Sequence, residues 1–264
     1  MNSRTTLRQM MLFLALPVAL SPLALAQRVA VRYPQGSVHG FLTVHSEDGA
    51  NIGYGESIQS VSGDRTTMRT TLHFRDGSLD DETAVYTQHR VIAFVSDHHI
   101  QRGPFFKTAI DEKVDASGQV SITTTGEDGK VKQESSHIDL PPDLSNGIVA
   151  PILYNIPHGS AGISVGMVLP VGKGRVIRLH ITPDSTASFT AVEGATRTAN
   201  IYRIKLDLGG IVGVVAPMIG KQPADVMLWV LEGPAPVVVR EDAQLSEGGP
   251  IISIRLAGTS YPSH

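Results

Sequence analysis

The 264-residue sequence contains no cysteine. This absence excludes disulfide bonds, thiolate ligands for a metal and a cysteine nucleophile. It also excludes a lipid attached to a cysteine behind a leader sequence, which bacterial lipoproteins require. A domain of more than about two hundred residues buries enough apolar surface to be stable without disulfide bonds.

Aromatic residues and an excess of basic charge are also lacking. Aromatic residues make up 5 % of the chain, which argues against an outer-membrane barrel, because such barrels carry girdles of aromatic side chains at both membrane interfaces. The formal net charge is −3, so a nucleic-acid partner is not expected. The remaining composition, 41 % hydrophobic and 18 % charged, is typical of a globular protein with a substantial core.

The first 26 residues have the three parts of a secretory signal peptide. Arg4 and Arg8 precede an apolar run over 10–20, and Ala-Leu-Ala at 24–26 is an A-x-A cleavage site. The run contains proline and is shorter than the ~20 apolar residues of a spanning helix, so we expect cleavage rather than anchoring. We therefore predict a periplasmic or secreted protein over 27–264 that is not integral to the membrane after cleavage.

Residues 38–131 form short runs of alternating polarity. Within one of them, Met68, Leu72 and Phe74 share one face, while Arg69, Thr71 and His73 share the other, which is the period of a half-buried strand. Turn signals containing glycine separate the runs, and the spacing predicts successive antiparallel hairpins. These turns are predicted at 47–49, 62–64, 75–77, 117–118 and 127–129.

The same alternation returns in the C-terminal part, with strands predicted at 175–181, 202–208 and 250–256. The stretch Tyr202–Arg240, which contains the strand Val226–Leu231 with apolar residues on both faces, is the predicted centre of the core. The glycine-rich segment 209–220 is predicted to pack against the sheet as an irregular plug or broken helix. The fold class is thus mainly β: one domain over 27–264, with a single large antiparallel sheet curled into a half-barrel or barrel.

Few helices are expected in this fold. Pro141 and Pro142 followed by Asp143 are typical of the start of a helix, whereas Gly147 and Pro151 would weaken it. A short or kinked helix is therefore predicted within residues 139–156, and the whole chain is predicted to contain one or two short helices.

Several segments resemble a family of uncharacterised secreted β-rich bacterial proteins that are similar to the lipoprotein-carrier half-barrels. The resemblance covers most of the mature chain, but its motifs are structural and imply no catalytic residues. Lipoprotein carriers bind acyl chains inside a half-barrel, so the resemblance implies an apolar ligand. The segments that carry it are Asp48–Tyr54, Pro141–Gly147, Gly220–Pro223, Ala224–Leu231, Pro236–Arg240 and Ile251–Leu256.

Gly162-Ile-Ser-Val-Gly166 matches the G-x-S-x-G motif, in which a strained turn between a strand and a helix exposes a serine nucleophile. The residues that follow predict a strand rather than a helix, and after the candidate acids the chain offers only His264 as a base. The motif is therefore interpreted as coincidental, and a hydrolase that uses Ser164 is the less favoured hypothesis.

Polar side chains around two predicted strands invite a metal hypothesis. His89, Asp97, His98 and His99 match no standard ligand spacing, and adjacent His98 and His99 point to opposite faces of a strand. Asp80-Asp-Glu82 lacks the alternating oxygen ligands and the glycine of a calcium loop. Both groups are interpreted as solvated positions, so neither a metal nor a cofactor is predicted.

Three functions stay open from the sequence. The favoured one is binding of an apolar or lipid-like ligand within the curled sheet, because residues 226–231 must face the interior on one side. The alternatives are a structural interaction protein of the cell envelope and the Ser164 hydrolase. Whether the interior is a cavity or a filled core is left open, as is the oligomeric state. The candidate ligand-binding residues are Ile204, Leu206, Met227, Trp229 and Leu231.

Overall fold

The computed structural model covers most of the predicted mature domain. The predicted signal peptide over 1–26 and the predicted plug over 209–220 lie outside the residues that it describes. None of the described helices is long and apolar enough to cross a membrane. The described residues are 28–156, 159–190, 194, 196–208, 223–231 and 233–261.

The strands named in the described residues form one antiparallel sheet of 14 strands, accompanied by one short helix, α1 (Val149–Asn155). The mainly β prediction is therefore confirmed. The first half of the sheet consists of β1 (Val38–Ser46), β2 (Asn51–Ser62), β3 (Arg65–Phe74), β4 (Leu79–Gln88), β5 (Ile92–Arg102), β6 (Ala109–Asp115), β7 (Gln119–Thr125) and β8 (Val131–His137). The second half consists of β9 (Ile163–Leu169), β10 (Arg175–Thr190), β11 (Thr196–Asp207), β12 (Val226–Leu231), β13 (Val237–Gln244) and β14 (Ile251–Ser260).

The sheet is open. Its order is β8-β7-β6-β5-β4-β3-β2-β1-β14-β13-β12-β11-β10-β9, so pairing of β1 with β14 joins the two halves. Among the described residues, β8 and β9 stand at opposite ends of this order and do not pair. The predicted barrel is therefore corrected: the sheet is neither closed nor strongly curled.

Local sequence explains the hairpins. Each predicted turn falls between two paired strands, as Arg75-Asp-Gly77 does between β3 and β4. Gly77 has φ 88°, a left-handed conformation that glycine adopts without steric cost. In β3, Leu72 and Phe74 are buried while Arg69 and His73 are exposed, as the alternation predicts. Thr71 departs from it, because it is buried beside Asp81, to which its hydroxyl donates a hydrogen bond at 3.3 Å.

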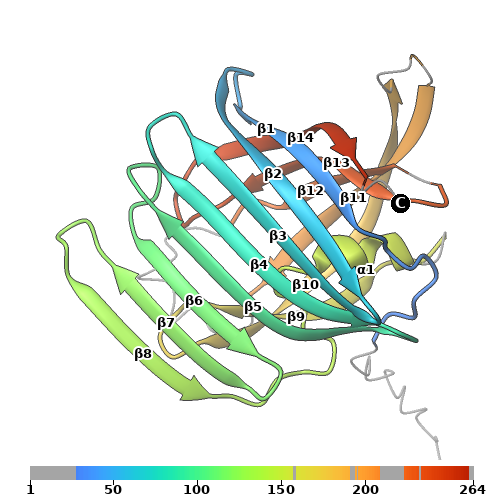
Figure 1. Cartoon of the computed structure of the whole chain (residues 1–264). Coiled ribbons are helices and arrows are strands. Elements are labelled where there is room, and N and C mark those ends of the chain that lie inside the picture. The colour runs from blue at the N-terminus through green and yellow to red at the C-terminus, as the bar shows by residue number, and fades with distance from the viewer. Residues whose placement is uncertain are drawn as a thin grey trace, which may run out of the picture.

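The two halves of the sheet share one main core. In Figure 1, β1–β8 lie nearer the viewer, β9–β14 lie behind them, and α1 lies between. Tyr86 of β4, Ile152 of α1, Leu179 of β10 and Leu228 of β12 belong to the same cluster of buried apolar side chains. The faces of the two halves that point toward each other are called the inner faces below, and their opposite sides the outer faces.

The segment before α1 differs from its prediction. A helix was expected to start near Asp143, but residues 143–146 instead pair with the edge strand β9, where the amide of Ser145 donates to the carbonyl oxygen of Gly166 at 2.8 Å. Gly147 then has φ 63°, which interrupts the chain direction before α1 begins at Val149. Backbone pairing and this left-handed residue therefore delay the helix.

Candidate functional site

The five predicted ligand-binding residues do not line one surface. Ile204 and Leu206 of β11 belong to the main core on the inner face. Met227 and Trp229 lie on the outer face. Met227 is the register partner of Arg203. The Trp229 ring lies under the guanidinium of Arg240, and the distance between the ring centroid and Cζ of Arg240 is 4.4 Å. Leu231 packs in a separate small apolar cluster with Trp229. Successive residues of a strand face opposite sides of the sheet, so the five predicted residues lie on two different faces.

On the inner face, α1 fills the space at one end of the main core. Tyr154 of α1 accepts a hydrogen bond at 3.1 Å from the amide of Val238, so the helix is tied to β13. A cavity of about 10 Å³ lies beside the helix, lined in part by Ile152 and Val165. This volume holds one water molecule at most. The α1 end of the inner face is therefore filled by the protein's own side chains.

The part of the inner face next to the main core is polar. Register pairing aligns Glu82, His99 and Glu112 in one row across β4, β5 and β6. Glu241 of β13 interacts electrostatically with this group from the facing half. We name the group the inner acidic cluster, and it consists of Asp80, Glu82, Asp97, His99, Glu112 and Glu241.

One ion pair anchors the inner acidic cluster. Nε2 of His99 lies 3.3 Å from Oδ2 of Asp80, and Nε2 of Gln101 donates to the same oxygen at 2.7 Å. Gln101 also donates to the carbonyl oxygen of Leu245 at 2.9 Å, which joins β5 to the second half of the sheet. The polar group therefore connects the two halves as well as filling the space between them.

The cluster is enclosed but not sealed. Asp97 is 3 % exposed and Glu112 is 2 % exposed. The His99 side chain keeps 24 % of its surface exposed, and Glu82 and Glu241 are half-buried. Because buried and half-exposed members adjoin, water reaches one side of the cluster.

Burial changes the protonation of these groups. It raises the pKa of Glu112 to about 8, and together with the charges of Glu82 and Asp80 it raises the pKa of Glu241 to about 7. Burial opposes the charged form of His99, but the hydrogen bond and charge of Asp80 outweigh it and raise the pKa to about 10. The cluster thus holds protons at neutral pH that the same residues in water would release.

The solvated interpretation was wrong for Asp80, Asp97 and His99 and right for His89 and His98. Asp80 and Asp97 are buried, and His99 points inward, whereas His98 points outward to Asp111 at 2.9 Å. His89 is exposed beyond the end of β4. The alternation of the sequence did indicate that these acids point inward, because Asp80 and Glu82 lie on the same face of β4 as buried Ala84 and Tyr86. No group of three His, Asp or Glu residues in the described part of the chain is arranged to hold a metal ion.

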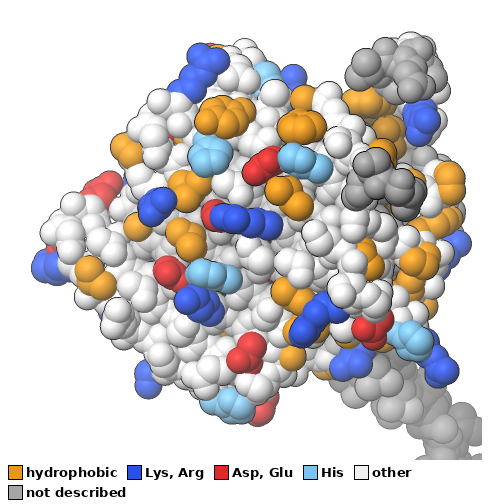
Figure 2. Space-filling view, in the orientation of Figure 1, with side chains coloured by type: hydrophobic (Ala, Val, Ile, Leu, Met, Phe, Trp, Pro, Cys, Tyr) orange, Lys and Arg blue, Asp and Glu red, His pale blue; other side chains and the backbone are white. Residues whose placement is uncertain are grey.

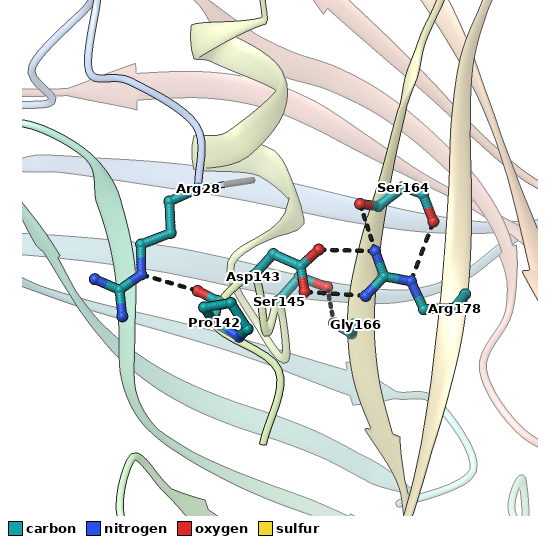
Figure 3. Close-up of polar contacts among 7 residues, drawn as sticks. All are labelled: Arg28, Pro142, Asp143, Ser145, Ser164, Gly166 and Arg178. Carbon is teal, nitrogen blue, oxygen red and sulfur yellow. Dashed lines mark hydrogen bonds and ion pairs between the residues drawn. The ribbon is translucent and has the colours of Figure 1, made fainter. Parts of the chain in front are cut away.

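Ser164 lies inside β9 and not at a turn between a strand and a helix. Its Oγ accepts a hydrogen bond at 3.2 Å from Nε of Arg178, whose two terminal nitrogens bind the carboxylate of Asp143 at 3.0 and 2.7 Å (Figure 3). The Asp143 side chain is 1 % exposed and the Arg178 side chain is 33 % exposed, so this ion pair is a structural link that satisfies a buried carboxylate and joins β9 and β10 to the segment before α1. The geometry gives Ser164 a hydrogen-bond donor as its neighbour instead of a base.

The outer face of β1–β8 has a different character. Figure 2 shows hydrophobic, basic, acidic and histidine side chains interspersed across it. Phe41 is 46 % exposed and Tyr54 is 65 % exposed. Nearby charges are paired, as in the bidentate contact of Arg69 with Asp81 at 2.9 and 2.7 Å.

Comparison with known proteins adds no family to this picture: no family model, no curated protein and no solved structure matches the chain. The candidate site is therefore the inner face, where an apolar cluster and the inner acidic cluster adjoin.

Proposed function

We propose that the protein is exported and binds an apolar or lipid-like ligand along the inner face of its sheet. The leader-like sequence over 1–26 supports export, and the resemblance to lipoprotein carriers supports an apolar ligand. The two halves of an open sheet would act as the walls of the binding site.

The proposal rests on one observation, an apolar strip on the inner face. This strip extends beyond the part of the main core that α1 fills. Leu206 and Val226 are packed against the main core but remain half-buried. Next to them, Leu228 is the register partner of Glu241, so the apolar strip directly adjoins a polar group. A surface of this kind fits a ligand that has an apolar chain and a polar end.

Apolar burial supplies the binding free energy in this proposal. Each buried CH₂ group contributes about 0.8 kcal/mol, so a chain of moderate length offsets the cost of association and reaches micromolar affinity. The halves need to separate locally to admit the chain, because the α1 end is already filled. Hydrogen exchange that slows in β11 and β12 on ligand binding would be the accompanying signature.

The test compares two adjacent residues on opposite faces. The Val226→Asp variant places a charge on the proposed apolar strip, and Met227→Asp places the same charge on the outer face. We expect the neutral apolar dye N-phenyl-1-naphthylamine to bind the wild-type protein and Met227→Asp, and to bind Val226→Asp at least tenfold more weakly.

Mass spectrometry of lipids extracted from the purified protein provides a second measurement. Equal dye binding by both variants, or a protein with neither dye binding nor co-purified lipid, would refute the proposed function. Circular dichroism spectra of both variants establish that each is folded.

The outer face favours a second function, that of an interaction protein of the cell envelope. Phe41 and Tyr54 are exposed aromatic side chains on the paired strands β1 and β2, and aromatic side chains are enriched at protein interfaces. Replacement of both by serine should abolish co-purification of an envelope protein without changing dye binding. Unchanged co-purification would remove this alternative.

A further inference from the structure

We propose that the inner acidic cluster binds a cationic nitrogen group, an ammonium or a guanidinium, carried by the ligand of the inner face. This inference rests on the proposed function and adds the chemistry of the ligand's polar end. The polar end would lie against Glu82 and Glu241, and the apolar chain would lie against Leu206 and Val226.

Two unsatisfied acceptors are the first support for this inference. Oδ1 of Asp97 and Oε1 of Glu112 are buried and have no hydrogen-bond partner in the described structure. Nearly all buried polar atoms in folded proteins have a partner, so two such oxygens in one cluster point to an absent donor. A nitrogen cation supplies several N–H donors at once.

The position of the Asp97 carboxyl group is consistent with a binding point that it shares with Glu82. A Cβ atom on Gly147 would lie 3.0 Å from Oδ1 of Asp97, 3.3 Å from the carboxyl carbon of Glu82 and 2.6 Å from Cβ of Ala84. The free oxygen of Asp97 therefore lies on the side of Glu82, which is half-buried. Glycine at 147 lets the chain pass beside both carboxyl groups without covering them with a side chain.

The charge balance of the cluster is the second support. Five carboxyl groups face one histidine, and that histidine is paired with Asp80. The charged groups that act on Asp97 and Glu112 are other carboxyl groups and His99, and those that act on Glu241 are carboxyl groups. A cationic ligand would therefore meet uncompensated negative potential once these groups ionise.

The geometry favours a nitrogen cation over a metal ion. Calcium and magnesium require several oxygens that converge within about 2.0–2.6 Å of one point. The described carboxyl groups do not converge in this way. An ammonium or guanidinium group instead donates hydrogen bonds to carboxylate oxygens at about 2.7–2.9 Å and in several directions. Dispersed acceptors on facing strands match that requirement.

The experiment uses ligands that share one apolar chain and differ in the polar end. Decylammonium, decanol and decanoate are titrated into the purified protein below their micelle concentrations, and methylguanidinium is titrated as a cation without a chain. We expect decylammonium to bind about tenfold or more tightly than decanol, because charge-assisted hydrogen bonds form only with the cation. Decanoate should bind most weakly. Decylammonium binding at pH 7 should also release protons, measured by calorimetry in two buffers.

Neutral isosteric variants locate the effect. Glu112→Gln and Asp97→Asn should reduce the preference for decylammonium over decanol to about threefold or less, since each removes a carboxyl group that can ionise when the cation binds. The matched control is Asp111→Asn, which removes a charge from the neighbouring residue on the outer face and should leave the preference unchanged. The comparison of ligands on the wild-type protein needs no variant, so it stands even if a variant fails to fold.

The outcomes separate this inference from the proposed function. Equal binding of decylammonium and decanol would support an apolar site and overturn the cationic one. Binding of methylguanidinium alone, lost in Glu112→Gln, would support the cationic site and overturn the proposed apolar ligand. Binding of none of the four probes would overturn both.

Discussion

Neighbouring residues of the same strands have opposite surroundings in this protein. On the outer face, His98 of β5 pairs with Asp111 of β6 at 2.9 Å, and both side chains are well exposed. One residue further along each strand, His99 and Glu112 point into the inner acidic cluster. The chemistry is nearly identical, an acid beside a histidine, yet solvent screens one set and the protein encloses the other.

The protonation of the two faces differs accordingly. The hydrogen bond from Arg69 lowers the pKa of Asp81 on the outer face, whereas burial raises the pKa of Glu112 on the inner face to about 8. A charged residue on a strand is thus either an exposed surface residue or a buried candidate for function, and its position in the strand alternation decides which.

Removal of the cation that pairs with a buried carboxylate should have the largest effect. Arg178→Met leaves the carboxylate of Asp143 buried without its cation, and the loss of such a partner costs about 3–5 kcal/mol in unfolding free energy. The matched outer-face variant Arg69→Met exposes Asp81 to water and should cost less than about 1 kcal/mol. Urea unfolding monitored by circular dichroism measures both. Similar losses in the two variants would contradict the contrast between the faces.

Alkaline pH should destabilise the protein through the inner face. Above pH 4.5 the unfolded chain releases the Glu112 proton, while the folded protein keeps it until about pH 8. The folded state then binds more protons, so its stability falls as the pH rises through this window. Glu241, with a pKa of about 7, and His99, raised from 6.5 to about 10, act in the same direction. The unfolding free energy should fall by about 2 kcal/mol or more between pH 5 and pH 9.

The outer face provides the contrast to this pH effect. The pKa of Asp81 is lowered from 3.8, so its contribution is present above that value and is lost as the pH falls further. Glu112→Gln should flatten the alkaline decline and leave the acid limb unchanged. An unfolding free energy that stays constant from pH 5 to pH 9 in the wild-type protein would contradict the raised pKa values of the inner acidic cluster.

The sequence predicted the strands better than it predicted their surroundings. Strand period and turn residues depend on near neighbours, and Leu72 and Phe74 were correctly assigned to a buried face. Asp80 and Glu82 were assigned to solvent because their burial depends on the second half of the sheet, more than one hundred residues away in the chain. A stricter use of the period would have placed them inward, in phase with Tyr86.

Loss of the Ser164 hydroxyl should have a smaller effect. In Ser164→Ala, Arg178 loses one hydrogen bond but retains Asp143 and the carbonyl oxygen of residue 164. We expect a loss of about 1 kcal/mol in unfolding free energy and no change in ester hydrolysis measured with p-nitrophenyl butyrate. A large fall in turnover by a folded variant would revive the hydrolase hypothesis.

Removal of an outer-face charge should have the smallest effect. Asp111→Asn breaks an exposed pair with His98, and exposed pairs of this kind contribute about 0–1 kcal/mol. The unfolding free energy should change by less than about 0.5 kcal/mol, with the pH profile of the wild type retained. A steeper alkaline decline in this variant would show that the two faces are electrostatically coupled through the sheet.

The site was less predictable than the fold, because the sheet period alone does not say which face is enclosed. Met227 and Trp229 were chosen with Ile204 as one binding set, but register pairing puts them on opposite sides. The inner side became clear only when α1 and the facing strands were seen to cover it. Long-range packing, and not local sequence preference, therefore determines which face is enclosed.

The pairing of residues 143–146 with β9 gives the sheet two unlike ends. At one end the chain itself occupies the backbone groups of Gly166, through Ser145 and Asp143. At the other end, β8 carries charged Lys132 and Glu134. A strand from a second molecule would therefore find one end already occupied and the other guarded by charge. Self-association by edge addition is thus discouraged at both ends, which would keep so wide an open sheet from polymerising at high concentration.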